Sequence, residues 1–272
     1  MDKVRKMERV AALTKLLADR PRHLFSLTYF SELFNAAKST ICEDLNTIRE
    51  TMVHFGLGTI ETVAGAAGGV RFIPGLSGRE ADKLLSDLAR RLAEPDRIIP
   101  GGFLYMSDLL FTPHLMVKVG EVFMERLAHL SPDYIVTVET KGIPLAFMTA
   151  RAFDLPLITV RRGSKVTEGS AVGINYVTGS SKRIQTMSLP KRALPAGARV
   201  LIIDDFMKAG GTARGMVDLA QEVGAEVCGI GVLVATAQPE HKLVDDYLAL
   251  LILHDVDEHT KVTDIRPVLT TG

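Results

Sequence analysis

The feature that most constrains this chain is a thirteen-residue stretch in its C-terminal half, Val200-Leu201-Ile202-Ile203-Asp204-Asp205-Phe206-Met207-Lys208-Ala209-Gly210-Gly211-Thr212. Four apolar residues, two adjacent acids, a loop of small residues and a helix beginning at Thr212 predict a buried parallel strand that leads into a helix N-terminus. Ligands of α/β sheets bind at this carboxyl edge of the strands. The stretch therefore predicts a ligand site in a parallel α/β domain.

The residue types in this stretch suit a phosphorylated sugar. Asp204 and Asp205 can accept hydrogen bonds from a vicinal diol such as the O2 and O3 hydroxyls of ribose. Backbone N–H groups from Lys208 to Thr212, together with the helix dipole and the Thr212 hydroxyl, can hold a 5′-phosphate. Two acids after a strand can also simply cap or solvate a loop, but the complete pattern favours the phosphate site.

Further strands and helices alternate around this stretch. An apolar strand from Asp133 to Val138 runs into Glu139-Thr140-Lys141-Gly142 and then a helix from Ile143 to Phe153. Additional strands are predicted at 155–160, which ends in Arg161-Arg162, and at 225–234. This alternation predicts a doubly wound parallel sheet.

The first 75 residues predict three short helices followed by a hairpin. The first helix runs from Lys3 to Asp19, and Thr28 is the predicted N-cap of the second, which ends near Asn35. The third begins near Lys38. The side chains expected to be buried on these helices are Met7, Val10, Leu13, Leu17, Phe30, Leu33, Phe34, Ile41, Leu45, Ile48, Met52 and Phe55.

The third helix and the hairpin together indicate a DNA-binding head. Lys38, Ser39 and Thr40 open the helix with a cation and short hydroxyls, which suits a recognition helix that enters the major groove. Strands at 59–63 and 70–73, joined by the glycine-rich residues 64–69, predict a wing, and Arg71 is a candidate phosphate contact. The glycine-rich tip is not a P-loop, because it lacks the GKS/T ending and precedes a strand.

Composition supports two domains and sets few other limits. A chain of 272 residues with 47% apolar and 24% charged residues is typical of a folded protein with two domains. We place these at 1–75 and 76–272, the second including a connecting helix at 79–93. The net charge is zero, and ten Lys and Arg against eight Asp and Glu in residues 1–75 form only a slight basic excess.

The sequence carries no pattern of a metal centre, a disulfide framework or a membrane span. Cys42 and Cys228 are the two cysteines, and the seven histidines have no ligand spacing. No hydrophobic run is long enough for a signal peptide or a membrane helix. We therefore expect a cytoplasmic protein without a metal site.

The segment from Gly163 to Lys191 leaves several interpretations open. It contains Lys165, Lys182 and Arg183, with two β-like runs at 172–177 and 183–189. It can form a lid over the ligand, a phosphate-binding flap or a basic surface that contacts DNA.

The thirteen-residue stretch resembles the phosphoribosyl pyrophosphate (PRPP) signature of type I phosphoribosyltransferases. With the winged-helix head, the chain from about Arg9 to Leu253 resembles the purine operon repressors of Gram-positive bacteria. The stretches that carry this likeness are Ala37-Lys38-Ser39, Gly65-Ala66-Ala67-Gly68-Gly69-Val70, Thr140-Lys141-Gly142-Ile143-Pro144, Lys165-Val166-Thr167-Glu168-Gly169 and 204–212. The implied fold is an N-terminal winged helix-turn-helix followed by a type I phosphoribosyltransferase-like doubly wound parallel sheet.

The resemblance implies a homodimer that binds operator DNA of purine-synthesis genes and leaves it when PRPP accumulates, without a catalytic role. No cofactor is implied beyond PRPP itself, with Mg²⁺ as an optional companion, and a guanine nucleotide is a candidate competitor. The PRPP-binding residues it implies are Thr140, Lys141, Gly142, Arg161, Asp204, Asp205, Phe206, Met207, Lys208, Ala209, Gly210, Gly211 and Thr212.

Two other functions fit parts of the sequence. An active purine phosphoribosyltransferase of the xanthine or adenine type has a similar strand, loop and helix, but it has no use for a DNA-binding head. Lys208 also departs from the small or hydroxylic residue usual in these enzymes. An RNA-binding attenuator on the same fold needs no winged helix.

Overall fold

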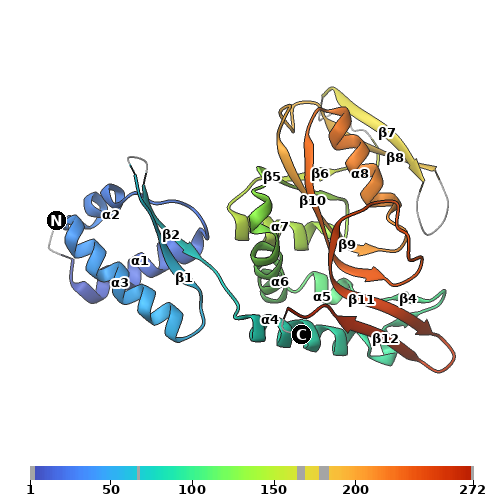
Figure 1. Ribbon diagram of the computed structural model, residues 1–272, viewed down its shortest axis with the longest axis horizontal. Coiled ribbons are helices and arrows are strands. Elements are labelled where there is room, and N and C mark those ends of the chain that lie inside the picture. The colour runs from blue at the N-terminus through green and yellow to red at the C-terminus, as the bar shows by residue number, and fades with distance from the viewer. Residues whose placement is uncertain (1–3, 66–67, 164–168, 178–183, 271–272) are drawn as a thin grey trace. The chain divides into compact units, whose positions relative to one another are not determined.

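The computed structural model describes residues 4–65, 68–163, 169–177 and 184–270 (Figure 1). The chain divides into two compact units. One, the head unit, consists of Met1–Ser77 together with Arg151–Asp154. The other, the sheet unit, consists of Gly78–Ala150 and Leu155–Gly272.

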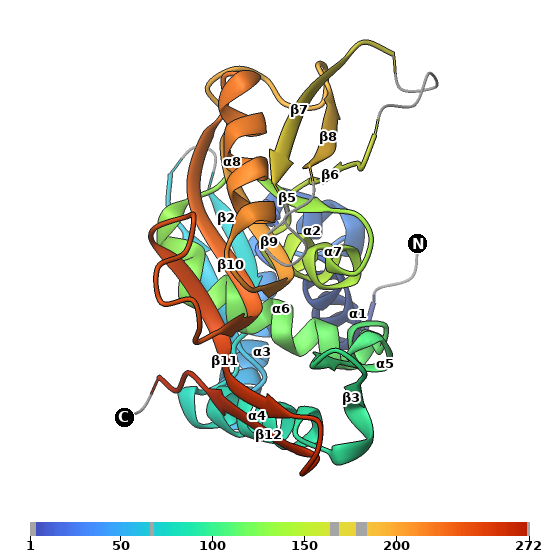
Figure 2. The same cartoon turned by 90° about the vertical axis from the view of Figure 1, so that its right-hand side faces the viewer.

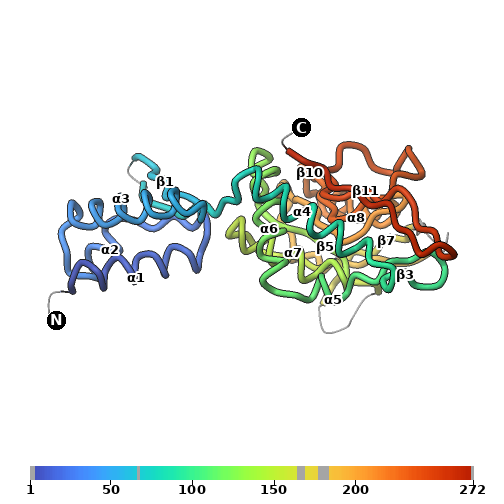
Figure 3. The backbone as a smooth tube through the Cα atoms, turned by 90° about the horizontal axis from the view of Figure 1, so that it is seen from below, coloured from blue at the N-terminus to red at the C-terminus, as the bar shows by residue number. Residues whose placement is uncertain are grey.

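The head unit contains three helices and a two-stranded antiparallel hairpin, drawn in blue in the tube trace (Figure 3). Buried apolar side chains from all three helices and both strands form one core. This arrangement confirms the predicted winged helix. The elements are α1 (Lys6–Asp19), α2 (Leu27–Phe34), α3 (Lys38–His54), β1 (Thr59–Val63) and β2 (Gly69–Ile73).

Four local predictions for the head unit were wrong. The N-cap of α2 is Ser26 and not Thr28, because the Ser26 hydroxyl accepts a hydrogen bond from the Tyr29 amide at 3.1 Å. Three side chains expected in the core are exposed instead. Met7 lies in the first turn of α1, Leu33 lies off the buried stripe of α2, and Phe55 lies beyond the end of α3, where helical periodicity no longer applies.

One ion pair is buried inside the head unit. The Arg9 guanidinium of α1 donates from Nε to Asp44 Oδ2 of α3 at 2.7 Å. The two side chains are 7% and 1% exposed, and Arg9 Nη1 also donates to the carbonyl oxygen of Val4 at 2.7 Å. This pair joins the first helix to the predicted recognition helix.

The sheet unit is built on six strands in the spatial order β12-β11-β10-β9-β5-β6. All neighbours are parallel except the edge pair β11 and β12. The predicted doubly wound sheet is therefore confirmed, with one antiparallel edge strand. The strands are β5 (Tyr134–Val138), β6 (Leu157–Val160), β9 (Arg199–Met207), β10 (Glu226–Thr236), β11 (Tyr247–Asp257) and β12 (Val262–Pro267).

The strand order creates a switch point between β5 and β9. From β5 the chain moves outward to β6, whereas from β9 it moves in the opposite direction to β10 and β11. The loops that leave the carboxyl ends of β5 and β9 therefore diverge, and they leave a crevice between them. Both predicted ligand loops begin at this point.

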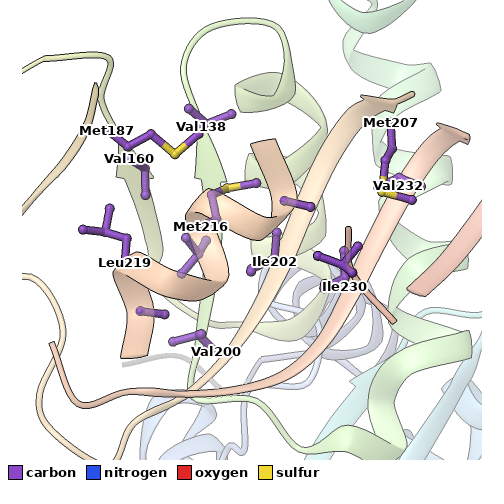
Figure 4. Close-up of a cluster of buried hydrophobic side chains, with 14 of the residues drawn as sticks. Val138, Val160, Met187, Val200, Ile202, Met207, Met216, Leu219, Ile230 and Val232 are labelled. Carbon is purple, nitrogen blue, oxygen red and sulfur yellow. The ribbon is translucent and has the colours of Figure 1, made fainter. Parts of the chain in front are cut away.

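Helices cover both faces of the sheet. On one face lies α8 (Gly211–Glu222), beside the hairpin of β7 (Ala171–Val177) and β8 (Ile184–Pro190) (Figure 2). Its Met216 and Leu219 lie in the same buried cluster as Ile202 and Ile230 of the sheet (Figure 4). This cluster fixes the position of the helix whose N-terminus faces the crevice.

The opposite face is covered by α6 (Pro113–Leu127), which packs against α7 (Gly142–Phe153). Side chains alternate along β10, so the position next to Ile230 points to this face. It is Gly231, where a Cβ would lie 2.8 Å from the Phe123 ring. A glycine is required there because the phenyl ring occupies the space of a side chain.

The remaining elements of the sheet unit precede the sheet or connect its parts. They are α4 (Gly78–Leu92), the 3-10 turn Pro95–Arg97, β3 (Ile98–Ile99), β4 (Phe103–Leu104), α5 (Ser107–Leu110) and the 3-10 turn Ala128–Leu130. Within the described ranges, no helix has the length and apolar character needed to span a membrane.

Candidate functional site

The two loops at the switch point face one cavity of about 580 Å³. One loop follows β5 and contains Lys141, and the other follows β9 and leads into α8. A second cavity of about 380 Å³ adjoins it on the side of Glu139 and Thr140. The predicted residues that line these cavities are Thr140, Lys141, Asp204, Asp205, Phe206, Met207, Lys208, Ala209, Gly210, Gly211 and Thr212.

Two adjacent carboxylates, Asp204 and Asp205, line both cavities. Asp204 is only 5% exposed, and its Oδ1 accepts a hydrogen bond from the backbone amide of Asp205 at 3.0 Å. Burial, followed by the negative charge of Asp205, raises the pKa of the Asp204 carboxyl well above its usual range. Burial also raises the pKa of Asp205. The negative charge of these acids is therefore disfavoured until a ligand or cation compensates it.

Two cations lie close enough to favour the ionised acids. The positive charges of Lys141 and Arg162 both act to lower the pKa of Asp205, and Arg162 also acts on Asp204. The effect of burial outweighs that of these cations, so the pKa of both carboxyls is raised. An anionic ligand in this cavity would therefore meet the same two cations as the acids.

The cavity is reached by Arg162, whereas the predicted Arg161 lines neither cavity. Arg161 lies directly beyond β6, where its guanidinium is 3.6 Å from Glu139 Oε2 and its backbone pairs with Ser188. The side chains of neighbouring residues in an extended chain point to opposite sides. An error of one residue in the sequence interpretation therefore selects the wrong arginine of the two as the one that faces the cavity. Arg162 is thus a site residue that the sequence interpretation missed.

The predicted residue Gly142 lies behind the acids at the start of α7. A Cβ on Gly142 would lie 2.6 Å from Thr137 Oγ1 and 3.0 Å from Asp204 Oδ1. Thr137 is fully buried, and its hydroxyl has no hydrogen-bond partner among the described residues. Gly142 therefore allows the first loop to approach the acid pair, and a larger residue would displace one of these groups.

The second loop is shaped for an anion. Gly210 adopts a left-handed conformation with φ of 80° as the N-cap of α8, which begins at Gly211. The first turn of a helix leaves N–H groups without intrahelical partners, and Gly210, Gly211 and Thr212 at this helix start line the cavity. The Tyr176 phenol of β7 donates to Gln185 Oε1, another residue of the cavity lining, at 2.9 Å.

A short hairpin forms the apolar wall of the same cavity. Strands β3 and β4 contribute Ile99, Phe103 and Leu104 to the lining. The base of this hairpin is fixed by Arg97, whose guanidinium binds both carboxylate oxygens of Asp108 at 2.8 and 2.9 Å. Strands of two residues are too short for a periodic pattern, so no signal in the sequence predicts this wall.

The predicted DNA-contacting residues lie in the head unit, three at the start of α3 and one on β2. Lys38 and Ser39 are exposed, and Thr40 is half-buried. Arg71 is not free, because its Nε donates to Glu61 Oε2 of the neighbouring strand at 2.7 Å. A phosphate must therefore compete with a carboxylate for this guanidinium.

Part of the predicted basic segment lies outside the described residues, namely Lys165, Lys182 and Arg183, and so do Ala66 and Ala67 of the wing tip. Lys191 and Arg192, which follow β8, are exposed. In the part of the chain that the structure describes, no three His, Cys, Asp or Glu side chains are grouped as metal ligands.

Comparison with known families identifies both units. Residues 5–74 match the model of the bacterial purine repressor N-terminal domain. Residues 107–264 match the phosphoribosyl transferase domain. The two matches together cover most of the chain.

Individual relatives agree with this division. The purine biosynthesis transcriptional repressor PurR of Bacillus subtilis is 48% identical over 97% of this chain and 93% of its own length. The purine biosynthesis transcriptional activator PurR of Lactococcus lactis is 36% identical over 97% of each. The adenine phosphoribosyltransferase structure from Thermoanaerobacter pseudethanolicus has a TM-score of 0.53 and 20% identity, and it covers 62% of this chain and 98% of its own. That last likeness shows the fold of the sheet unit.

Proposed function

Because the chain belongs to the purine repressor family of Gram-positive bacteria, we propose that PRPP in the cavity of the sheet unit releases its head unit from the operators of purine-synthesis genes. The observation that carries the proposal is the buried pair Asp204 and Asp205 opposite a helix N-terminus in one cavity. PRPP joins a ribose diol and a 5′-phosphate in one molecule, and these are the groups that the two features suit.

Each part of PRPP has a chemical counterpart in the cavity. The ribose hydroxyls donate to the acid pair, and the 5′-phosphate accepts from the loop 208–212. The pyrophosphate faces the first loop, where Thr140, Lys141 and Arg162 line the second cavity. The cations compensate the negative charge of pyrophosphate and of the two acids together.

The residues of the cavity also suit two further ligands, a Mg²⁺ ion and a guanine nucleotide. Carboxylate oxygens are ligands that Mg²⁺ prefers, so Asp204 and Asp205 fit an ion that arrives with pyrophosphate. A guanine nucleotide carries ribose and phosphates as well, and its base would contact the apolar wall formed by β3 and β4. We propose it as a competitor of PRPP for the cavity.

The head unit supplies the DNA contacts in this proposal. Lys38, Ser39 and Thr40 approach the major groove, Arg71 contacts a backbone phosphate, and a homodimer presents two such heads. Lys38→Ala should reduce DNA affinity and lower the slope of log affinity against log salt by about one, with PRPP affinity unchanged. Repression is the proposed sign of regulation, because the repressor relative is more similar than the activator.

Release requires that PRPP bind the DNA-free form more tightly. Each tenfold loss of operator affinity needs about 1.4 kcal/mol of coupling, and DNA must weaken PRPP binding by the same factor. Titration calorimetry of PRPP into the full chain, with and without operator DNA, tests this reciprocity. Equal PRPP affinities in the two titrations would contradict the proposal.

The rival function is an active purine phosphoribosyltransferase, which the match of residues 107–264 favours. The head unit favours the regulator, since a transferase needs no DNA-binding domain. The two are separated by incubating the chain with PRPP, Mg²⁺ and adenine, guanine or xanthine. Release of pyrophosphate with formation of a nucleotide would support the enzyme.

A further inference from the structure

A segment that follows β10 supports the loop proposed to bind the 5′-phosphate. We call residues 208–210 the phosphate loop and residues 236–244 the support segment. The Leu243 amide donates to the carbonyl oxygen of Ala209 at 2.9 Å. A Cβ on Gly210 would lie 3.1 Å from the Leu243 nitrogen and 3.5 Å from Lys242 Cβ. The two segments therefore pack directly against each other.

A threonine hydroxyl makes the second link between these segments. Thr236 is the last residue of β10, and its Oγ1 lies 3.1 Å from the carbonyl oxygen of Lys208 and 2.6 Å from that of Gln238. The hydroxyl has one proton, so it serves one of these acceptors at a time.

A lysine holds this threonine in place. Lys242 Nζ donates to the Thr236 carbonyl oxygen at 2.7 Å and lies 3.2 Å from Thr236 Oγ1. A donor on Oγ1 directs the hydroxyl proton away from Lys242 and toward the carbonyl acceptors. Burial lowers the pKa of the Lys242 ammonium. Across the described ranges, no carboxylate lies within salt-bridge distance of it.

These bonds set the direction of the N–H groups in the phosphate loop. In a planar trans peptide, the C=O and the following N–H point in opposite directions. The carbonyls of Lys208 and Ala209 point to the support segment. The amides of Ala209 and Gly210 therefore point away from these acceptor-bound carbonyls, and both residues line the cavity, as does Thr236 itself.

We propose that Lys242 is a positioning residue for the 5′-phosphate: it orders the phosphate loop through Thr236, and its positive charge, unpaired with any carboxylate of the described ranges, remains beside the bound anion. This inference rests on the proposed function, because it assumes a ligand that carries a 5′-phosphate. Lys242 lines neither cavity, so it acts through the loop and through its charge.

The test compares two partial ligands in the full chain. Ribose 5-phosphate probes the phosphate loop, and inorganic pyrophosphate probes the loop after β5. Calorimetry should show that Lys242→Met lowers the affinity for ribose 5-phosphate about tenfold or more and leaves the affinity for pyrophosphate unchanged. A loss of this size is expected when hydrogen bonds of a charged group are removed. Lys83→Met, on the exposed surface of α4, is the matched control and should change neither affinity.

A second pair of variants covers the case in which Lys242→Met does not fold. Thr236→Val removes the hydroxyl and should weaken ribose 5-phosphate about fivefold, whereas Thr236→Ser keeps the hydroxyl and should bind as the unsubstituted chain does. Unchanged ribose 5-phosphate affinity in Thr236→Val and Lys242→Met overturns the inference. An equal loss of affinity for ribose 5-phosphate and pyrophosphate also overturns the inference, since that result indicates a general loss of structure. Failure of the unsubstituted chain to bind either ligand instead contradicts the proposed function.

Discussion

Each unit of the molecule contains an aspartate that is at most 5% exposed, and the surroundings of these two carboxylates are opposite. In the head unit, Asp44 is 1% exposed and receives the Arg9 guanidinium at 2.7 Å. In the sheet unit, Asp204 is 5% exposed and has a second acid, Asp205, as its immediate neighbour. The first carboxylate is paired with a cation inside the fold, whereas at the second the effect of burial and of Asp205 outweighs that of the nearby Arg162.

The difference separates a structural charge from a functional one. A buried ion pair costs desolvation but fixes the orientation of the two helices that carry it. An uncompensated buried acid destabilises the folded chain, and such groups are concentrated at ligand sites. Removing the charge of Asp44 should therefore harm the fold, whereas removing that of Asp204 should harm only the binding of ligand.

The largest expected effect is in the head unit. Asp44→Ala leaves the Arg9 guanidinium buried without its partner, which should lower the free energy of unfolding by about 3 to 5 kcal/mol. Hydrogen exchange of the amides of α1 and α3 in the full chain measures this change. The exposed pair of Lys15 and Asp19 is the control, and Asp19→Ala should cost less than about 1 kcal/mol. If Asp44→Ala lowers the free energy of unfolding by as little as the control does, Asp44 does not have the structural role that distinguishes it here from Asp204.

In the sheet unit, Asp204→Asn should weaken PRPP about 10- to 100-fold, because a charged acceptor of ribose hydroxyls is lost. When both chains are free of ligand at neutral pH, the free energy of unfolding of this variant should equal that of the original chain or exceed it by about 0.5 to 2 kcal/mol. Calorimetry and urea unfolding measure the two quantities. Asp218→Asn, on the exposed side of α8, should change neither. A destabilised Asp204→Asn without ligand would show that Asp204 has a structural role after all.

The pKa of Asp204 predicts the pH dependence of this effect. Its pKa in the folded chain is raised above the unfolded value, so the folded state binds more protons. The contribution of Asp204 to stability is therefore present at low pH and is lost as pH rises from the ordinary carboxyl range through the folded pKa. Unfolding of Asp204→Asn should lack this decline, whereas PRPP affinity of the original chain should rise over the same pH range. An identical pH profile for the two chains would contradict the assignment.

Gly142→Ala should disturb the acid pair without changing any charge. The added methyl group would collide with Thr137 Oγ1 and Asp204 Oδ1, and the overpacking should cost about 1 to 3 kcal/mol and weaken PRPP. Gly173→Ala is the control, because its methyl group would meet neighbours only at ordinary contact distance. Equal unfolding midpoints for the two variants would show that the close approach at Gly142 is not required.

The smallest effect concerns the exposed pair on the wing. Glu61→Gln removes the carboxylate that holds Arg71. Because this ion pair lies at the surface, it is weak, and operator affinity should rise only about two- to fivefold at low salt. Fluorescence anisotropy of labelled operator DNA measures it. Lower operator affinity would mean that Glu61 orients Arg71 for DNA and does not compete with it.

The sequence predicts the parts of the site that have a strong local pattern and misses the parts that do not. The stretch around Asp204 combines a buried strand, two acids and a glycine loop, so its chemistry and its strand-loop-helix pattern both indicate the same ligand site. Arg161 and Arg162 differ by one residue at a strand end, and an alternating pattern cannot decide which of them faces the cavity. The apolar wall at β3 and β4 and the support by Lys242 depend on contacts between distant parts of the chain, which no local pattern records.

The most direct test of the account follows operator DNA on the full chain during a titration with PRPP, with Asp204→Asn measured in parallel. The original chain should release its DNA as the cavity fills, and the variant should retain DNA at the same PRPP concentrations. Retention of operator DNA by the original chain, with PRPP occupancy verified by calorimetry, would contradict this prediction.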